Sequence, residues 1–142
     1  METAVALAKL GTVWLATVTM VMSVMMSYTG SIEARSAARS AARAAAASLS
    51  GSGWNCTETG TEWTAATTAA AAASGDRLRG SGRLRVVDFA LESDTATCTV
   101  LASLEVLPVT FGWWMGTIHS IGCAPTSAGV GLGLRTVCGQ EL

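Results

Sequence analysis

The sequence predicts an α+β protein in which one long N-terminal helix carries a small head of a short helix and antiparallel strands. Two observations support this prediction. An apolar run over residues 10–28 holds no charged side chain and leads directly into an Ala/Arg/Ser stretch, Ile32–Ser50. From Arg83 onward the hydrophobic pattern changes from helical to partly alternating, with many Val, Leu and Thr residues. We therefore divide the chain into a helical part, residues 1–50, and a head, residues 51–142.

The apolar run is long enough to cross a bilayer. At about 1.5 Å of rise per residue, residues 10–28 cover nearly the roughly 30 Å of the hydrocarbon core. Trp14 and Tyr28 lie near its ends, where interfacial aromatic side chains are favoured. We expect a retained transmembrane helix from Thr3 to Tyr28. The alternatives are a cleaved signal peptide and a buried helix of a soluble domain.

The Ala/Arg stretch continues the helix as a stem. Ala and Arg have high helix propensity, and Arg35, Arg39 and Arg43 recur every four residues, so they share one face. The small side chains between them allow another helix to approach closely. The stem is thus either a lateral packing surface or a solvated Ala-rich rod. The S-G-S-G sequence of residues 50–53 predicts its end.

All four cysteines, Cys56, Cys98, Cys123 and Cys138, follow the apolar run. An even number on one side of a membrane indicates an oxidising, extracytoplasmic compartment and two disulfides. The arginines beside the membrane favour the opposite topology by the positive-inside rule. We give the cysteines more weight and expect the head to be extracytoplasmic.

Three disulfide connectivities are possible. We prefer Cys123 with Cys138, because closing a loop of about 15 residues is worth about 3 kcal/mol in the chain-entropy model. Four buried free thiols are the alternative. The wide cysteine spacing and the single histidine, His119, disfavour a zinc site.

The head is expected to be small and to depend on its disulfides for stability. Ser93-Asp94 predicts the turn of a hairpin, and Gly, Ser and Pro mark a later loop. The expected elements are a helix over residues 62–73, strands over 84–91, 95–107, 109–115 and 134–138, and a loop over 124–133.

No pattern predicts catalysis. The chain has one histidine and lacks nucleophile-elbow, P-loop and metalloprotease motifs, so we expect no enzyme activity, cofactor or metal. A net charge of −1 argues against nucleic-acid binding. Arginines at 77, 79, 83 and 85 suit phosphate or carboxylate, although an exposed turn and strand edge explains them more simply. Trp113 and Trp114 are the candidate partner contacts, with core packing as the alternative for at least one.

Two strings in the helical part carry a family resemblance. Glu2–Leu7 reads E-T-A-V-A-L, and Ala34–Ala46 reads A-R-S-A-A-R-S-A-A-R-A-A-A. In this order and spacing they resemble actinobacterial TadE-like proteins, minor pseudopilins of the tight-adherence (Tad/Flp) pilus system. The resemblance covers the helical part well and the head in outline. It implies that Glu2 takes the place of the pilin-type glutamate, which meets a positive group on a neighbouring subunit.

We therefore expect a non-catalytic, single-pass, pilin-like structural or assembly subunit of a bacterial Tad or type IV-related pilus or secretion machine. It would reside in the inner membrane, or in a surface filament, and contact other pilin-like subunits and an inner-membrane assembly platform. Glu2, Arg35, Arg39 and Arg43 are its expected assembly residues, and no small-molecule substrate is expected. The alternative is a secreted, disulfide-bonded binding module released by signal-peptide cleavage.

Overall fold

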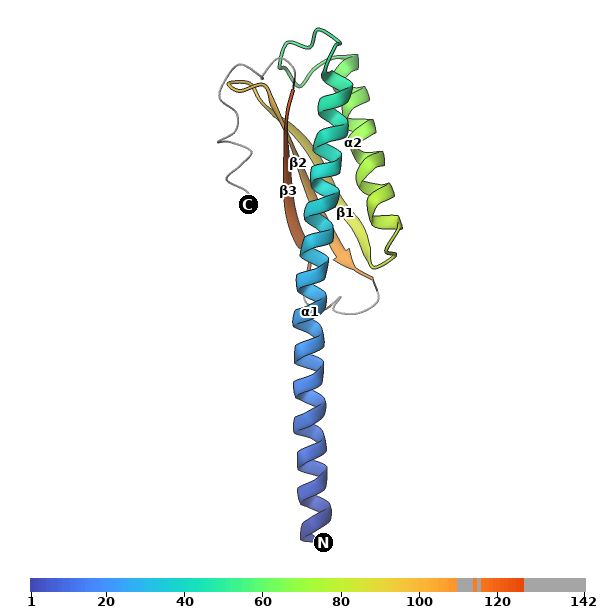
Figure 1. Cartoon of the computed structure of the whole chain (residues 1–142), viewed down its shortest axis with the longest axis vertical. Helices are drawn as coiled ribbons and strands as arrows, with labels where there is room; N and C mark the ends of the chain where they lie inside the picture. The colour runs from blue at the N-terminus through green and yellow to red at the C-terminus, as the bar shows by residue number, and fades with distance from the viewer. Residues whose placement is uncertain (110–113, 115, 127–142) are drawn as a thin grey trace.

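A computed structural model describes residues 1–109, 114 and 116–126. It confirms an α+β chain with a long apolar N-terminal helix, a second helix and antiparallel strands, arranged as in Figure 1. The elements in chain order are α1 (Glu2–Leu49), α2 (Thr61–Arg79), β1 (Leu84–Asp94), β2 (Thr99–Pro108) and β3 (Ile118–Pro125).

Helix α1 is continuous from the apolar run to the end of the stem, as the sequence predicts. It stops at Ser50, whose backbone is extended and whose amide and hydroxyl both donate to the Ala46 carbonyl, at 2.9 and 2.7 Å. Gly51 and Gly53 follow with φ of 95° and 70°, a left-handed conformation that glycine adopts without steric cost. The predicted helix stop is therefore confirmed.

Only the C-terminal part of α1 belongs to the core of the head. Its buried face consists almost entirely of small residues: Gly30, Ala34, Ala37, Ala38, Ala41, Ala42, Ala45, Ala46 and Leu49. The sheet and α2 of the same chain cover this alanine face. The close approach that the small residues allow is thus used within the molecule.

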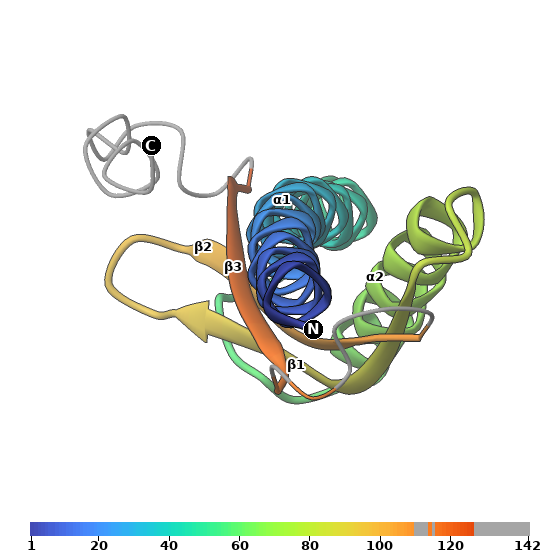
Figure 2. The ribbon, with the colours of Figure 1, turned by 90° about the horizontal axis from the view of Figure 1, so that it is seen from below.

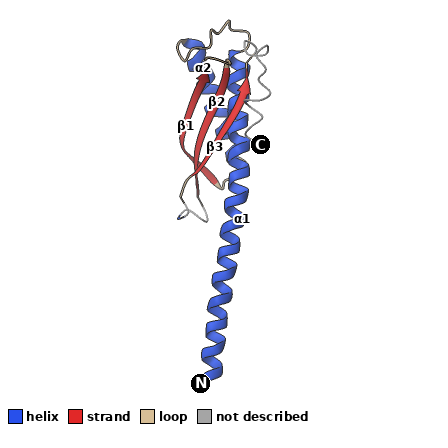
Figure 3. Ribbon diagram, turned by 90° about the vertical axis from the view of Figure 1, so that its left-hand side faces the viewer, coloured by secondary structure: helices blue, strands red, loops and turns tan. Residues whose placement is uncertain are grey.

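The three strands form an antiparallel sheet in the order β1-β2-β3. Figures 2 and 3 show the strands curving around α1, with α2 beside it on the same side of the sheet. Val100, Ala102, Leu104 and Val106 of β2 face the helices and are buried. The outer face of the sheet carries the alternate side chains, as expected for an antiparallel sheet with one covered face.

Strand β3 approaches α1 most closely at Gly122. A Cβ atom at this position would overlap the backbone of Ala38 and the amide of Arg39. Closer to the N-terminus of α1, a Cβ at Gly30 would lie 3.0 Å from the Ile118 side chain. Glycine on the strand and small residues on the helix therefore set the distance between sheet and helix.

Helix α2 is longer than the predicted 62–73, because its buried stripe Ala66, Ala70, Ser74 and Leu78 continues past Gly75. This stripe recurs every four residues and packs against α1, so tertiary contact extends the helix beyond its local stop signal. As a result the arginines at positions 77 and 79 are helical, not part of a turn.

The strands differ from the predictions in three ways. Ser93 and Asp94 are not the hairpin turn, because they pair with Val100 and Thr99 and the turn follows them. Strand β3 was not predicted, since packing against α1 selects small residues that carry no strand signal; it ends at 125, inside the expected loop over 124–133. The strand expected over 109–115 lies mostly outside the described residues, and its two described positions, 109 and 114, are not in a strand. The strand expected over 134–138 lies wholly outside them.

A disulfide joins Cys56, in the loop after α1, to Cys98, in the β1–β2 turn, across a sequence separation of 42. Both residues have positive φ, 64° and 51°, in the left-handed region that a side chain disfavours. Cys123 is also disulfide-bonded. Its preferred partner, Cys138, lies outside the described residues. For the three described cysteines the alternative of free thiols is wrong.

We predict that Gly122→Ala lowers the free energy of unfolding by about 1–3 kcal/mol, because the new methyl group must push β3 away from α1. Gly75→Ala is the matched control: its Cβ would meet nothing within 4 Å, and it should stabilise α2 by up to about 1 kcal/mol. Urea unfolding of the oxidised chain in mild detergent, followed by circular dichroism, measures both. Equal midpoints for Gly122→Ala and wild type would show that β3 does not pack as described.

We predict that replacing Cys56 and Cys98 together by serine lowers the free energy of unfolding by about 4 kcal/mol, the chain-entropy value for a loop of this length. The measurement is the same urea titration, with intact mass to verify that the remaining cysteines stay oxidised. An unchanged midpoint would mean that the disulfide does not support the head.

Candidate assembly surface

The N-terminal part of α1 projects beyond the head (Figure 1), and none of residues 1–29 is buried. An 18-residue window of this helix has mean hydropathy 1.7 and no residue buried inside the chain. By length and composition the helix is able to cross a membrane, although a signal sequence near the N-terminus would have the same properties. This surface is apolar and uncovered by the described parts of the chain.

The hydroxyl groups on the projecting segment do not contradict an apolar environment. Four of them donate to a backbone carbonyl one turn earlier on α1: Thr17 to Val13 at 2.8 Å, Thr19 to Leu15 at 2.7 Å, Ser23 to Thr19 at 2.8 Å and Thr29 to Met25 at 3.0 Å. A hydroxyl bonded in this way needs no partner from water, which is the requirement inside a bilayer. These four hydroxyl groups therefore add little polarity to the apolar run.

The arginine ridge, Arg35, Arg39 and Arg43, lies on the exposed side of α1, opposite the alanine face. Within the described part of the chain these three guanidinium groups make no ion pair. A groove toward α2 flanks the ridge, and there the Arg77 Nε donates to the Ser36 hydroxyl at 3.1 Å. The ridge is thus a row of positive charges that no described carboxylate of the same chain neutralises.

A second groove lies on the other flank of the ridge, toward β3. Arg35 and Arg39 line it together with His119, whose Nε2 is 3.6 Å from the Glu105 carboxylate. Ser120 lines it too, and its buried hydroxyl has no hydrogen-bond partner among the described residues. Two guanidinium groups at the mouth of this groove suit a carboxylate or phosphate.

The outer face of β1 carries acidic side chains, here called the acidic strip: Asp88, Glu92 and Asp94. Asp88 and Glu92 are exposed and Asp94 is partly buried. None of the three makes an ion pair with a described residue. The strip and the arginine ridge lie on opposite sides of the head, since the sheet and the alanine face of α1 lie between them.

The ridge and the strip stand at matching levels along α1. Gly122 lies against Ala38 and pairs with Ala102, which pairs in turn with Leu91, so Leu91 is level with Ala38. From the rise of helix and strand, Glu92 is then level with Arg39, and Asp94 with Arg43, to within about 3 Å. Asp88 lies within about 5 Å of the level of Arg35.

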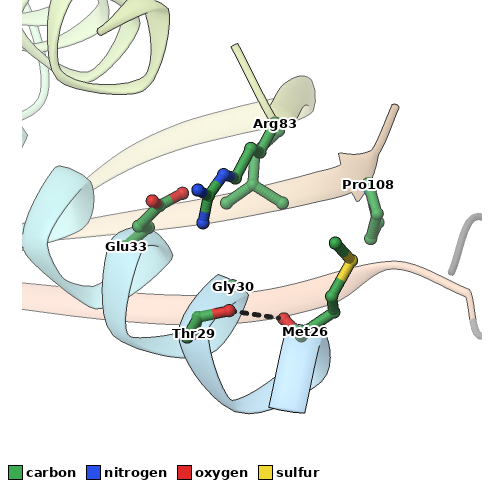
Figure 4. Close-up of a pocket in the computed structure, with 7 residues that line it drawn as sticks. Met26, Thr29, Gly30, Glu33, Arg83 and Pro108 are labelled. Carbon is green, nitrogen blue, oxygen red and sulfur yellow. Dashed lines mark hydrogen bonds between the residues drawn. The ribbon is translucent and has the colours of Figure 1, made fainter. Parts of the chain in front are cut away.

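A small crevice marks the point where α1 leaves the head. Met26, Thr29 and Glu33 of α1 line it from one side, and Arg83 and Pro108 at the base of the sheet line it from the other. Figure 4 shows the Arg83 guanidinium pointing toward the Glu33 carboxylate, which also accepts a hydrogen bond of 3.1 Å from the Ser81 hydroxyl. Arg83 therefore lies beside a methionine of the apolar run.

The predicted site residues do not form one site. Glu2 lies in the first turn of α1, at the far end from the head, and is exposed. Trp114 is 52% exposed, whereas Trp113 lies outside the described residues. Sequence reasoning missed the acidic strip and the crevice, because both depend on strand register and on the packing of β1 beside α1.

Among the described residues no group of three metal-binding side chains occurs. Comparison of the chain with family models, curated proteins and solved structures finds no match. The function must therefore be argued from the geometry of the molecule.

Proposed function

We propose that the protein is a membrane-anchored, non-catalytic assembly subunit of a bacterial pilus or secretion machine of the Tad or type IV-related kind. The observation that supports this most is the division of one uninterrupted helix at Gly30. Above this residue α1 is packed into the head, and below it the apolar surface has no cover from the described chain. Burying an apolar segment of this length requires lipid or other subunits.

The disulfides support a head on the oxidising side of the membrane. Cys56–Cys98 and the bonded Cys123 belong to the head, and disulfides persist outside the cytosol. The proposal therefore places the arginine ridge outside the cytoplasm, against the positive-inside tendency. That tendency is statistical, and a folded, oxidised head is the stronger constraint.

Each end of α1 has a part in the proposed assembly. Glu2, at the exposed first turn, meets a positive group of a neighbouring subunit within the membrane, because a lone carboxylate is costly there. The arginine ridge meets carboxylates of a lateral neighbour. In a second copy standing in the same membrane, the acidic strip offers such carboxylates at matching levels. Copies standing side by side would then associate through two different faces, the arginine ridge of one against the acidic strip of the next.

A second candidate is a secreted binding module. It is favoured by the position of Gly30, where the uncovered part of α1 meets the packed part. Cleavage near residue 30 would remove the uncovered segment and leave the alanine face within the head. The same helix would then have served as a signal sequence.

We predict that the native chain occurs at full length in the inner membrane or in sheared surface filaments, lighter than the reduced mass by the four hydrogen atoms lost in forming two disulfides. Intact mass spectrometry of membrane, filament and culture-supernatant fractions measures this. A species that lacks about the first 30 residues and occurs only in the supernatant would overturn the anchored subunit and support the secreted module.

We further predict that Arg39→Glu and Glu92→Arg each reduce self-association of the chain by tenfold or more, because each places like charges face to face. The two substitutions together should restore it. Cross-linking of the chain in membranes, read as the yield of dimer and higher species, measures the effect. Glu62→Arg, an equal charge change at an exposed position of α2 away from both surfaces, should leave the yield unchanged.

If the double variant stays as poor as the single ones, the ridge and the strip do not contact one another. If the single variants assemble like wild type, the ridge is not a lateral contact at all.

A further inference from the structure

We infer that the membrane-proximal end of the head binds the phosphate groups of anionic lipids through an arginine collar of Arg79, Arg83 and Arg85. This inference rests on the proposed membrane anchoring of α1 and adds a second contact with the bilayer. All three side chains are exposed in the structure.

The level of the collar follows from its neighbours. Arg83 lines the same crevice as Met26, a residue of the apolar run. Leu84, next in the chain, approaches Gly30, and Arg85 follows it on the outer face of β1. If the run to Tyr28 fills the hydrocarbon core, Arg83 stands at the depth of the lipid headgroups.

The end of α2 brings the third guanidinium to this level. Leu78 packs in the same cluster as Ala34, so Arg79 lies near the crevice and not toward the far end of the head. Asp76 forms an ion pair with Arg79 at 4.0 Å, but both side chains are largely exposed to solvent, where such a pair is weak. Glu33 offsets part of the charge of Arg83, which leaves the end of the head with an excess of positive charge.

The first residue after β2 also supports an orientation in which the collar end of the head faces the bilayer. The connection to β3 leaves the sheet at Pro108 and carries Val109, 54% exposed, and Trp114, 52% exposed. Val109 lies beside Arg83, since its amide donates to the Arg83 carbonyl at 2.9 Å. An exposed apolar side chain beside an arginine, as Val109 is beside Arg83, suits a surface that lies on a bilayer.

A lipid surface fits these groups better than a protein partner does. Any molecule that reaches Arg83 must share the space beside Met26 with the bilayer surface. Arginines near an anionic leaflet gain attraction from its surface potential, and this gain declines within a Debye length of about 8 Å at physiological salt. Arg43, about 22 Å above Tyr28 along α1, lies beyond that range.

The test is hydrogen exchange of the full, oxidised chain in nanodiscs of phosphatidylcholine, with or without about one third phosphatidylglycerol. We expect the amides of residues 79–86 to exchange about three- to tenfold more slowly in the anionic discs, because bound headgroups oppose local opening. The difference should vanish in 1 M salt. Exchange at Val100 and Leu104, in the core, reports whether each variant is folded.

The variant that changes Arg79, Arg83 and Arg85 to glutamine should lose the dependence on anionic lipid, whereas Arg43→Gln, the matched control, should keep it. Equal exchange in both kinds of disc, or a triple variant that still responds, would overturn the collar while leaving the anchored helix intact. If the slow exchange of residues 79–86 depends on the number of chains per disc and not on the lipid composition, the collar contacts another protein chain and does not bind lipid. Failure of the chain to enter discs would overturn the anchoring as well.

Discussion

The alanine face of α1 and the backbone of β3 meet at Gly122 without a side chain between them. The position of the whole sheet depends on this approach, because β2 and β1 are paired outward from β3 residue by residue. An alanine buries less apolar area than a leucine, so a core of alanines stabilises through short distances and close packing more than through size. Such a core gives a modest margin of stability. The Cys56–Cys98 disulfide, which ties the loop after α1 to the far end of the hairpin, compensates for this.

The same helix satisfies two different environments in succession. Below Gly30 its surface is largely apolar, and the hydroxyl groups of Thr17, Thr19 and Ser23 are bonded to carbonyls of the same helix. Above Gly30 one side carries alanines for the sheet and the other carries the arginine ridge. No break in the backbone separates these parts, so the membrane segment and the head are one mechanical unit in the proposed subunit.

The elements with a strong local signal could be predicted from the sequence. The long helix, its stop at Ser50 and the β1–β2 hairpin rest on hydrophobic period, helix propensity and glycine, and the structure confirms them apart from the turn position. The features that the sequence did not predict are decided by contacts between residues distant in the chain. Strand β3 has a strand conformation despite Ser120, Gly122 and Ala124, because these small residues suit the surface of α1. The acidic strip is equally hidden in the sequence, since only the strand register shows which levels its carboxylates reach.

The continuity of α1 has a geometric consequence for the head. From Tyr28 to Ser50 the helix rises by about 33 Å. Transmembrane helices tilt on average by about 20°, and more where the bilayer is thin relative to the apolar span. Without a hinge, a tilt of about 20° displaces the far end of the head sideways by about 11 Å. The thickness of the surrounding bilayer would thus set the angle at which the head is presented to its neighbours.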